Sequence, residues 1–182
     1  VYGNICWRTP WGVLIGGGRD NVVQNNVFYN CVTGIHIDGR GLDPHEVWHN
    51  SIYRTMKERL EAMNWREPPY SERYPQLSSL EKYYQADSGV PPGDDTIRHN
   101  ISVGGQWLDI GWFATPEMVD VRDNLVDEDP HFVNPGSDVL GFRLKEDSPA
   151  LKLGFHPLPL ERIGLYRDEF RRRVPRAASN AG

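Results

Sequence analysis

Apolar residues in the first forty positions fall in short runs that repeat after twenty-two residues. The run Asn4-Ile5-Cys6 aligns with Asn26-Val27-Phe28, and residues 11–15 align with residues 33–37. Each copy holds β-branched runs separated by Gly, Asn and Asp, which is the pattern of short strands joined by tight turns. A repeat of this length predicts parallel strands that stack about 4.8 Å apart around a continuous core.

The same signal returns further along the chain at Asn100 and Asn124, where it predicts further strands of the stack. We expect successive asparagines to bond one another at the corners between strands. The alternation of side chains along each strand predicts a set of inward-facing apolar residues, namely Ile5, Val13, Ile15, Val27, Ile35, Ile37, Ile101 and Leu125. The predicted fold class is therefore all-β, a right-handed parallel β-helix (solenoid) fragment with a partly helical insertion and a C-terminal cap.

The insertion lies between the second and third copies of the repeat, because Asn26 and Asn100 are too far apart for one or two turns. Residues 51–65 and 77–85 have helical composition, with Met56, Leu60 and Met63 on one face of the first helix. We expect residues 1–41 to form β-helix coils, residues 42–95 to form a helical insertion packed on them, and residues 96–182 to form the closing coils and cap. The whole chain would be one domain.

In the last third, residues 129–133 and 141–144 are expected to be short strands. Ser148 followed by Pro149 predicts a helix start, with Ser as the N-cap. A final amphipathic stretch, residues 160–170, is expected to cover the open end of the stack.

Composition narrows the classes of partner. The chain has 182 residues with 38% hydrophobic and 25% charged residues and a net charge of −5, which argues against nucleic-acid binding. No run approaches eighteen apolar residues, so no membrane span or membrane partner is expected. The basic cluster at residues 167–176 is interpreted as a solvated tail. No Cys/His spacing resembles a zinc site, and the two cysteines do not form a disulfide framework.

The candidate chemistry centres on the strand at residues 34–38. Alternation turns His36 and Asp38 outward with Cα atoms about 6.6 Å apart, a span that can flank one sugar ring. Arg40 follows at the turn, and these three are the candidate catalytic residues. In the alternative interpretation, Asp38 and Arg40 brace the base of the insertion and His36 is a solvated neighbour.

Three further residues are candidates for substrate binding. Arg19 and Asp20 lie one repeat earlier beside a glycine run at residues 16–18, and Trp107 offers a flat face for a pyranose. No metal ligand and no cofactor are predicted, although the carboxylates of Asp127, Glu128 and Asp129 could take calcium if they are more than a solvated turn.

Several segments resemble one family. Gly17-Gly18-Arg19-Asp20-Asn21, Gly34-Ile35-His36-Ile37-Asp38-Gly39-Arg40-Gly41 and the ending Asp129-Pro130-His131-Phe132-Val133 are similar to right-handed parallel β-helix proteins of the pectate-lyase-like superfamily. The chain looks like the C-terminal part of the β-helix module of bacterial carbohydrate-active enzymes.

This resemblance implies a protein that acts on a polysaccharide or oligosaccharide and is secreted or periplasmic. A glycoside hydrolase is favoured; the alternatives are a polysaccharide lyase and a non-catalytic carbohydrate-binding or structural module. Because such modules are usually longer, the chain alone is expected to be inactive. An exposed first coil would also favour self-association.

Overall fold

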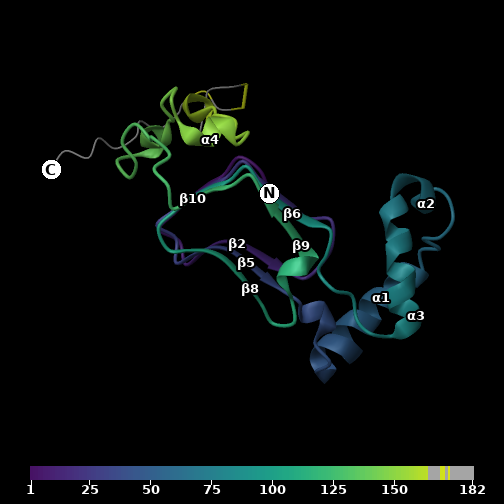
Figure 1. The fold of residues 1–182 in the computed structure, drawn as a ribbon. Coiled ribbons are helices and arrows are strands. Elements are labelled where there is room, and N and C mark those ends of the chain that lie inside the picture. Colours follow the sequence, from purple (N-terminus) through teal and green to yellow (C-terminus); the bar gives the residue numbers. More distant parts are fainter. Residues whose placement is uncertain (164–168, 171, 173–182) are drawn as a thin grey trace.

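Ten short strands in the described part of the chain form three parallel sheets. The computed structural model describes residues 1–163, 169–170 and 172. The sheet orders are β1-β4-β7-β10, β2-β5-β8 and β3-β6-β9, and Figure 1 shows β2, β5 and β8 lying one behind another. The strands are β1 (Ile5–Trp7), β2 (Trp11–Gly16), β3 (Val22–Gln24), β4 (Val27–Tyr29), β5 (Thr33–Asp38), β6 (Asp95–Arg98), β7 (Ile101–Val103), β8 (Gln106–Gly111), β9 (Val119–Arg122) and β10 (Leu125–Val126).

The strand register follows the sequence repeat. Ile5 pairs with Val27, which pairs with Ile101, and Ile101 pairs with Leu125. Six of the eight residues predicted to face inward are buried: Ile15, Val27, Ile35, Ile37, Ile101 and Leu125. The other two, Ile5 and Val13, are half-buried and pack against the core clusters. The predicted inward direction is confirmed for Ile15, Ile35 and Ile37, which lie in the core cluster shared by the three sheets, and for Val13, which packs against it. It is wrong for Ile5, Val27, Ile101 and Leu125, because these pack with the phenylalanines of the C-terminal segment on the other side of their sheet.

A ladder of asparagines runs along one corner of the strands. The backbone N and Nδ2 of Asn26 each donate to Oδ1 of Asn100 at 3.0 Å, and Asn100 donates in the same way to Asn124 at 2.9 Å. Asn26 and Asn100 are almost fully buried, so these bonds satisfy polar groups that would otherwise be costly. The left-handed turn residue is the one before each ladder asparagine, as at Asn25 and His99.

The helices of the insertion have an aromatic core of their own. Tyr53, Trp65 and Tyr84 form a buried cluster, and Leu60 packs against it. Of the three residues expected on one face of the first helix, Met56 is 60% and Met63 47% exposed, and Met63 lies beyond the end of α1. The helical elements are η2, a π-helix (Val47–Tyr53), α1 (Arg54–Glu61), α2 (Tyr70–Arg73), η3 (Pro75–Leu80) and α3 (Glu81–Ala86).

The two ends of the insertion meet at its base. The backbone N of Val90 donates to the carbonyl of Gly41 at 3.0 Å. A Cβ on Gly41 would lie 2.3 Å from the carbonyl oxygen of Val90, so only glycine permits this approach. The pairing holds the helices beside the strands, where Figure 1 shows α1 and α3. The division into segments 1–41, 42–95 and 96–182 stays a prediction.

The fold-class prediction of an all-β β-helix is wrong. Helices account for about 30% of the described residues, and the strands form three separate sheets of only three or four short strands each. The physical reason is that the twenty-two-residue pattern covers the strands but not the rest of the chain. Across residues 47–86 the apolar residues have helical spacing. After β10, prolines and glycines favour short 3₁₀ turns. The chain is a mixed structure in which short parallel sheets carry helical additions.

The segment after β10 packs on the outside of the β1-β4-β7-β10 sheet. Phe132, Phe142 and Phe155 join Val27 and Ile101 in one buried cluster. The expected strand at residues 141–144 is wrong: Asp138 caps the 3₁₀ helix η5 (Val139–Phe142), and only a single antiparallel bridge joins Phe132 to Leu144. The 3₁₀ helices η1 (Arg40–Leu42) and η4 (Pro116–Met118) precede it, and η6 (Leu160–Arg162) follows.

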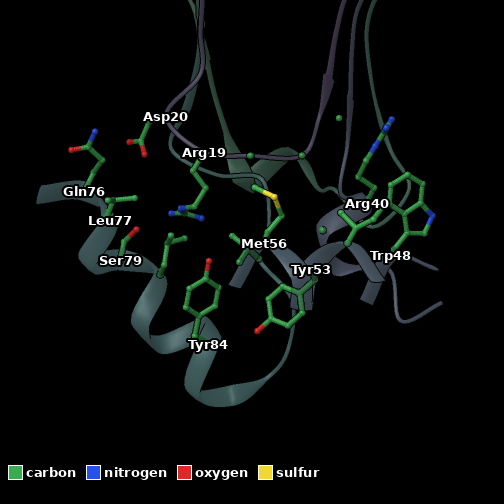
Figure 2. Close-up of a pocket in the computed structure, with 17 residues that line it drawn as sticks. Arg19, Asp20, Arg40, Trp48, Tyr53, Met56, Gln76, Leu77, Ser79 and Tyr84 are labelled. Atoms are coloured by element: carbon green, nitrogen blue, oxygen red, sulfur yellow. The ribbon is translucent and has the colours of Figure 1, made fainter. Parts of the chain in front are cut away.

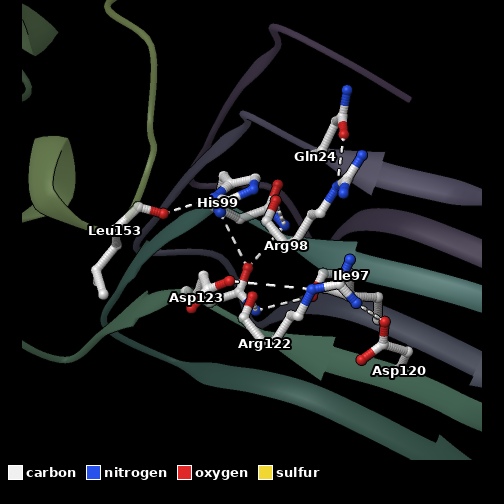
Figure 3. Close-up of polar contacts among 10 residues, drawn as sticks. Gln24, Ile97, Arg98, His99, Asp120, Arg122, Asp123 and Leu153 are labelled. Carbon is white, nitrogen blue, oxygen red and sulfur yellow. Dashed lines mark hydrogen bonds and ion pairs between the residues drawn. The ribbon is translucent and has the colours of Figure 1, made fainter.

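Polar contacts fasten this segment to the corner of the sheets. Nδ1 of His99 donates to the carbonyl of Leu153 at 2.5 Å, as Figure 3 shows. Within the strands, Nε of Arg98 on β6 donates to Oε1 of Gln24 on β3 at 2.9 Å. Residues 164–168 of the predicted cap at residues 160–170, and most of the basic cluster at residues 167–176, lie outside the described residues. No helix in the described ranges has the length and apolar character that a membrane crossing requires.

The predicted helix start at Ser148 is confirmed and supports a stability test. Helix α4 (Pro149–Lys152) has Ser148 as its N-cap, whose Oγ accepts from the backbone N of Ala150 at 3.3 Å. The Ser148→Ala substitution removes this side-chain cap. It is therefore expected to lower the free energy of unfolding, measured by urea denaturation, by about 1 kcal/mol. The exposed Ser88→Ala variant is the control, and an equal loss in both would contradict the capping role.

Candidate functional site

His36 lies on the outer face of the β2-β5-β8 sheet between two carboxylates. Its Nδ1 is 2.7 Å from Oδ2 of Asp109 on the neighbouring strand β8, and its Nε2 is 3.7 Å from Oδ2 of Asp38 on its own strand. The Asp109 side chain is 42% exposed and the His36 side chain 17%. The first contact is a hydrogen bond of a kind that orients an imidazole for proton transfer.

An indole covers one side of this histidine. The ring of Trp11 is stacked on the imidazole of His36 with centroids 5.3 Å apart and an interplanar angle of 10°. Trp11 is 55% exposed, so part of its surface remains open beside the imidazole. A flat apolar ring next to a proton-transfer group is an arrangement suited to a sugar ring.

Asp38 is held by Arg40 and is not open to solvent. Its Oδ1 accepts from Nε of Arg40 at 2.7 Å and from the Arg40 backbone at 3.2 Å, while its Oδ2 pairs with Nη2. Burial by itself raises the pKa of Asp38, but the hydrogen bonds and charge of Arg40 outweigh burial and lower the pKa below its ordinary value. The carboxylate is therefore ionised at neutral pH.

Asp38 faces outward as predicted, but its side chain is covered, and its predicted catalytic role stays a prediction. The side chain of Asp38 lies on the outer face of β5, but only 1% of its surface is accessible to solvent. The Arg40 guanidinium folds back over it into space left by Gly16, where a Cβ would lie 2.7 Å from Cζ of Arg40. The structure thus favours the alternative interpretation for Asp38, which braces Arg40.

Arg40 packs against two indoles that also contact each other. Its Cζ is 5.3 Å from the ring centroid of Trp48 in the insertion and 5.5 Å from that of Trp112, just after β8. Nε1 of Trp112 donates to Asp43 at 2.8 Å, which fixes that ring. Because 30% of the Arg40 side chain is exposed, the guanidinium has accessible surface that the Asp38 pairing leaves available.

A pocket of about 680 Å³ opens between the strands and the insertion, with Arg40 in its wall. Figure 2 shows Arg19 reaching from the strand side toward Tyr84 on the insertion helix. The floor includes the bare backbone of residues 16–18, and the wall of the insertion is apolar. The apolar lining comprises Trp48, Ile52, Tyr53, Met56, Leu77, Leu80, Tyr84 and Val90.

Both predicted binding residues of the first repeat reach this pocket. Arg19 and Asp20 line it, and Arg19 pairs with Asp94 at the rim. Nη1 of Arg19 makes a long contact of 3.4 Å with Oη of Tyr83, and its buried Nε has no hydrogen-bond partner among the described residues. Two guanidinium groups therefore line the pocket, that of Arg19 paired with Asp94 and that of Arg40 paired with Asp38.

The remaining candidates lie elsewhere. Trp107 packs with the core against Phe28, with ring centroids 6.3 Å apart, rather than lining the pocket. In the acidic cluster, Asp127 accepts from the backbone of Gly104 and Asp129 from that of His131. No group of three or more His, Cys, Asp or Glu residues in the described ranges is arranged to hold a metal ion.

Sequence reasoning missed Asp109, Trp11 and Trp48. Asp109 is opposite His36 because β5 and β8 pair across the insertion, with Ile35 beside Leu108. The signal was the apolar alternation of residues 106–111, which aligns with residues 33–38 once the insertion is removed.

Comparison of the chain with protein-family models, with curated proteins and with solved structures finds no match.

Proposed function

We propose that this protein cleaves a polysaccharide by proton transfer at His36, with the saccharide seated along Trp11 and the pocket beside Arg40. The observation that carries the proposal is the hydrogen bond between His36 and the accessible carboxylate of Asp109 on the adjoining strand. It combines a titratable ring, an orienting carboxylate and an exposed aromatic surface on one face of a sheet.

The chemistry follows from the two ring nitrogens. Asp109 accepts from Nδ1 of His36, which leaves Nε2 as the atom that takes or gives a proton. A positioned acid or base contributes a factor of about 10² to 10⁴ in rate. Asp38 does not share this role, because Arg40 keeps it ionised and covered.

Hydrolysis is the first candidate reaction. Asp109 supplies an accessible carboxylate and His36 a group able to protonate the leaving oxygen or activate water. The sugar rings would lie on apolar and aromatic surface, as the pocket wall formed by the insertion offers.

Elimination is the second candidate, and the two guanidinium groups favour it. Arg19 and Arg40 line the same pocket, so they could neutralise the carboxylate of a uronic acid. Neutralisation would acidify the adjacent C–H proton, which His36 would remove as a base while the glycosidic oxygen departs. A third outcome, binding without cleavage, would make the chain a carbohydrate-binding module.

The test is a panel of neutral and uronate-containing polysaccharides incubated with the protein. New reducing ends without an ultraviolet-absorbing product indicate hydrolysis, and an unsaturated, absorbing product indicates elimination. The His36→Ala variant must abolish either product, whereas His156→Ala, which changes an exposed histidine of the C-terminal segment, must not. Cleavage that survives His36→Ala, or binding of no polymer at all, overturns the proposal.

A further inference from the structure

The pocket beside Arg40 has an apolar interior that a sugar ring alone does not explain. Most of the side chains that the insertion contributes to it are apolar or aromatic, and two of them, Ile52 and Met56, are 43% and 60% exposed. A pyranose carries hydroxyl groups around its ring, and each hydroxyl needs a hydrogen-bond partner when it is buried. This interior therefore favours a ligand group without hydroxyls.

The polar residues of the pocket lie toward its two ends. Figure 2 shows Arg40 at one end and Asp20 and Gln76 toward the other, with Met56 and Tyr53 between them. The volume of about 680 Å³ lies within the range of about 300 to 1,000 Å³ that is usual for pockets that bind drug-sized molecules. The pocket therefore has room for part of a sugar unit at the Arg40 end and for a further ring in the apolar middle.

The positive charges in the pocket wall already have partners. Arg40 pairs with Asp38, and Arg19 pairs with Asp94. Among the described residues, the lining holds no basic side chain besides these two arginines, and Asp20 adds a negative charge to it. An anion in the apolar middle would therefore compete with two carboxylates for the guanidinium groups, and the Asp20 charge would repel it. This arrangement of charges favours a neutral group in the pocket.

The pocket begins next to the proton-transfer pair. Nε2 of His36 is 3.7 Å from Oδ2 of Asp38, and the same oxygen pairs with Nη2 of Arg40, which lines the pocket. The neighbouring floor is the bare backbone of residues 16–18. A sugar unit that lies beside His36 and Arg40 can therefore place a substituent in the apolar middle while the sugar itself stays at the reacting group.

We propose that the pocket binds an aromatic acyl group that is esterified to the polysaccharide, so that the protein selects acylated sugar units. An aromatic ring fits this lining because Tyr53 and Tyr84 can pack against its face or edge, and Met56 can contact it through sulfur. The ester is neutral, as the charges of the pocket favour. The inference rests on the proposed function for the polymer, and on the pocket alone for the acyl group.

Isothermal titration calorimetry with small sugars tests the acyl group separately from cleavage. The probes are the benzoyl ester of glucose, glucose itself and glucuronic acid, and none of them has a glycosidic bond to cleave. The ester is expected to bind about tenfold or more tightly than glucose, because its ring leaves water for apolar surface. Glucuronic acid is expected to bind no more tightly than glucose, because the guanidinium groups are already paired.

A matched pair of substitutions locates the binding. Met56→Asp places a charge in the apolar middle at a 60% exposed position, and it is expected to weaken binding of the ester about tenfold or more. The control is Met63→Asp, which changes a 47% exposed methionine of the insertion that does not line the pocket, and it should leave binding unchanged. Circular dichroism checks that each variant is folded, and Ile52→Asp replaces Met56→Asp if that variant is not.

Equal binding of the ester and of glucose, unchanged binding of the ester in Met56→Asp, or an equal loss in Met63→Asp overturns the inference. Tighter binding of glucuronic acid than of the ester also overturns it, and favours elimination as the reaction. A protein that cleaves a polysaccharide but does not bind the ester keeps the proposed function and loses this inference. A protein that binds the ester as expected but cleaves no polysaccharide contradicts the proposed function and supports the acyl-group pocket.

Discussion

Replacing Asp38 with Asn is expected to lower the free energy of unfolding by about 2 to 3 kcal/mol. The substitution leaves the Arg40 guanidinium without the carboxylate that accepts from its Nε and Nη2. Removing one partner of a buried ion pair costs about 3 to 5 kcal/mol, and the partial exposure of Arg40 reduces this because water can hydrate it. Urea denaturation of the two proteins at neutral pH measures the difference.

The matched control is Asp94→Asn, because Asp94 pairs with Arg19 but is 64% exposed. An exposed pair contributes about 0 to 1 kcal/mol, so this variant is expected to lose far less stability than Asp38→Asn. Equal losses in the two variants would contradict the assignment of Asp38 as a buried brace for Arg40.

The same pair predicts how stability depends on pH. The folded pKa of Asp38 is lowered, so its contribution is present above the pKa of the unfolded chain, about 3.9, and is lost as the pH falls toward the folded pKa. The difference in unfolding free energy between wild type and Asp38→Asn should therefore shrink in acid. A difference that stays constant from neutral pH to pH values well below about 3.9 would contradict this cause.

Replacing His36 with Ala is expected to lower turnover on the cleaved polysaccharide by about 10²-fold or more, the size of a lost acid–base group. The free energy of unfolding should change much less than in Asp38→Asn. The imidazole is 17% exposed, and its removal leaves no buried charge without a partner. Turnover at saturating substrate and the melting temperature are measured on the same samples. Asp109→Asn should also lower turnover, since the amide no longer provides a carboxylate for Nδ1.

The comparison of these variants distinguishes a catalytic role of His36 from a structural role of Asp38. His36→Ala should lose activity with a nearly unchanged melting temperature, whereas Asp38→Asn should lose stability first. If His36→Ala unfolds the protein as readily as Asp38→Asn does, then His36 is a structural residue and the proton-transfer role is wrong.

The sequence repeat was sufficient to predict strand register but not fold class. Period-two alternation and recurring asparagines are local signals, so the pairing of Ile5 with Val27 and the bonds from Asn26 to Asn100 could be anticipated. The proportion of helix could not be anticipated, because the repeat does not extend to residues 47–86 or to the segment after β10.

The candidate site was predictable in part for similar reasons. Alternation places His36 and Asp38 on the outer face of their strand, but it does not show that Arg40 folds back over Asp38. That arrangement depends on a side-chain conformation and on the space above Gly16 in the neighbouring strand. Asp109 meets His36 only because two strands pair across the insertion, which is a tertiary contact.

The most direct test of the proposed site is an NMR titration of the ¹H–¹⁵N signals of histidine rings and tryptophan indoles. The ligand is the set of oligosaccharides released from whichever polysaccharide the protein cleaves. We expect shifts for His36, Trp11 and Trp48, the rings beside the acid–base pair and the pocket. Trp65, buried in the aromatic cluster of the insertion, should stay unchanged. Shifts that leave His36 and Trp11 unmoved would contradict the account.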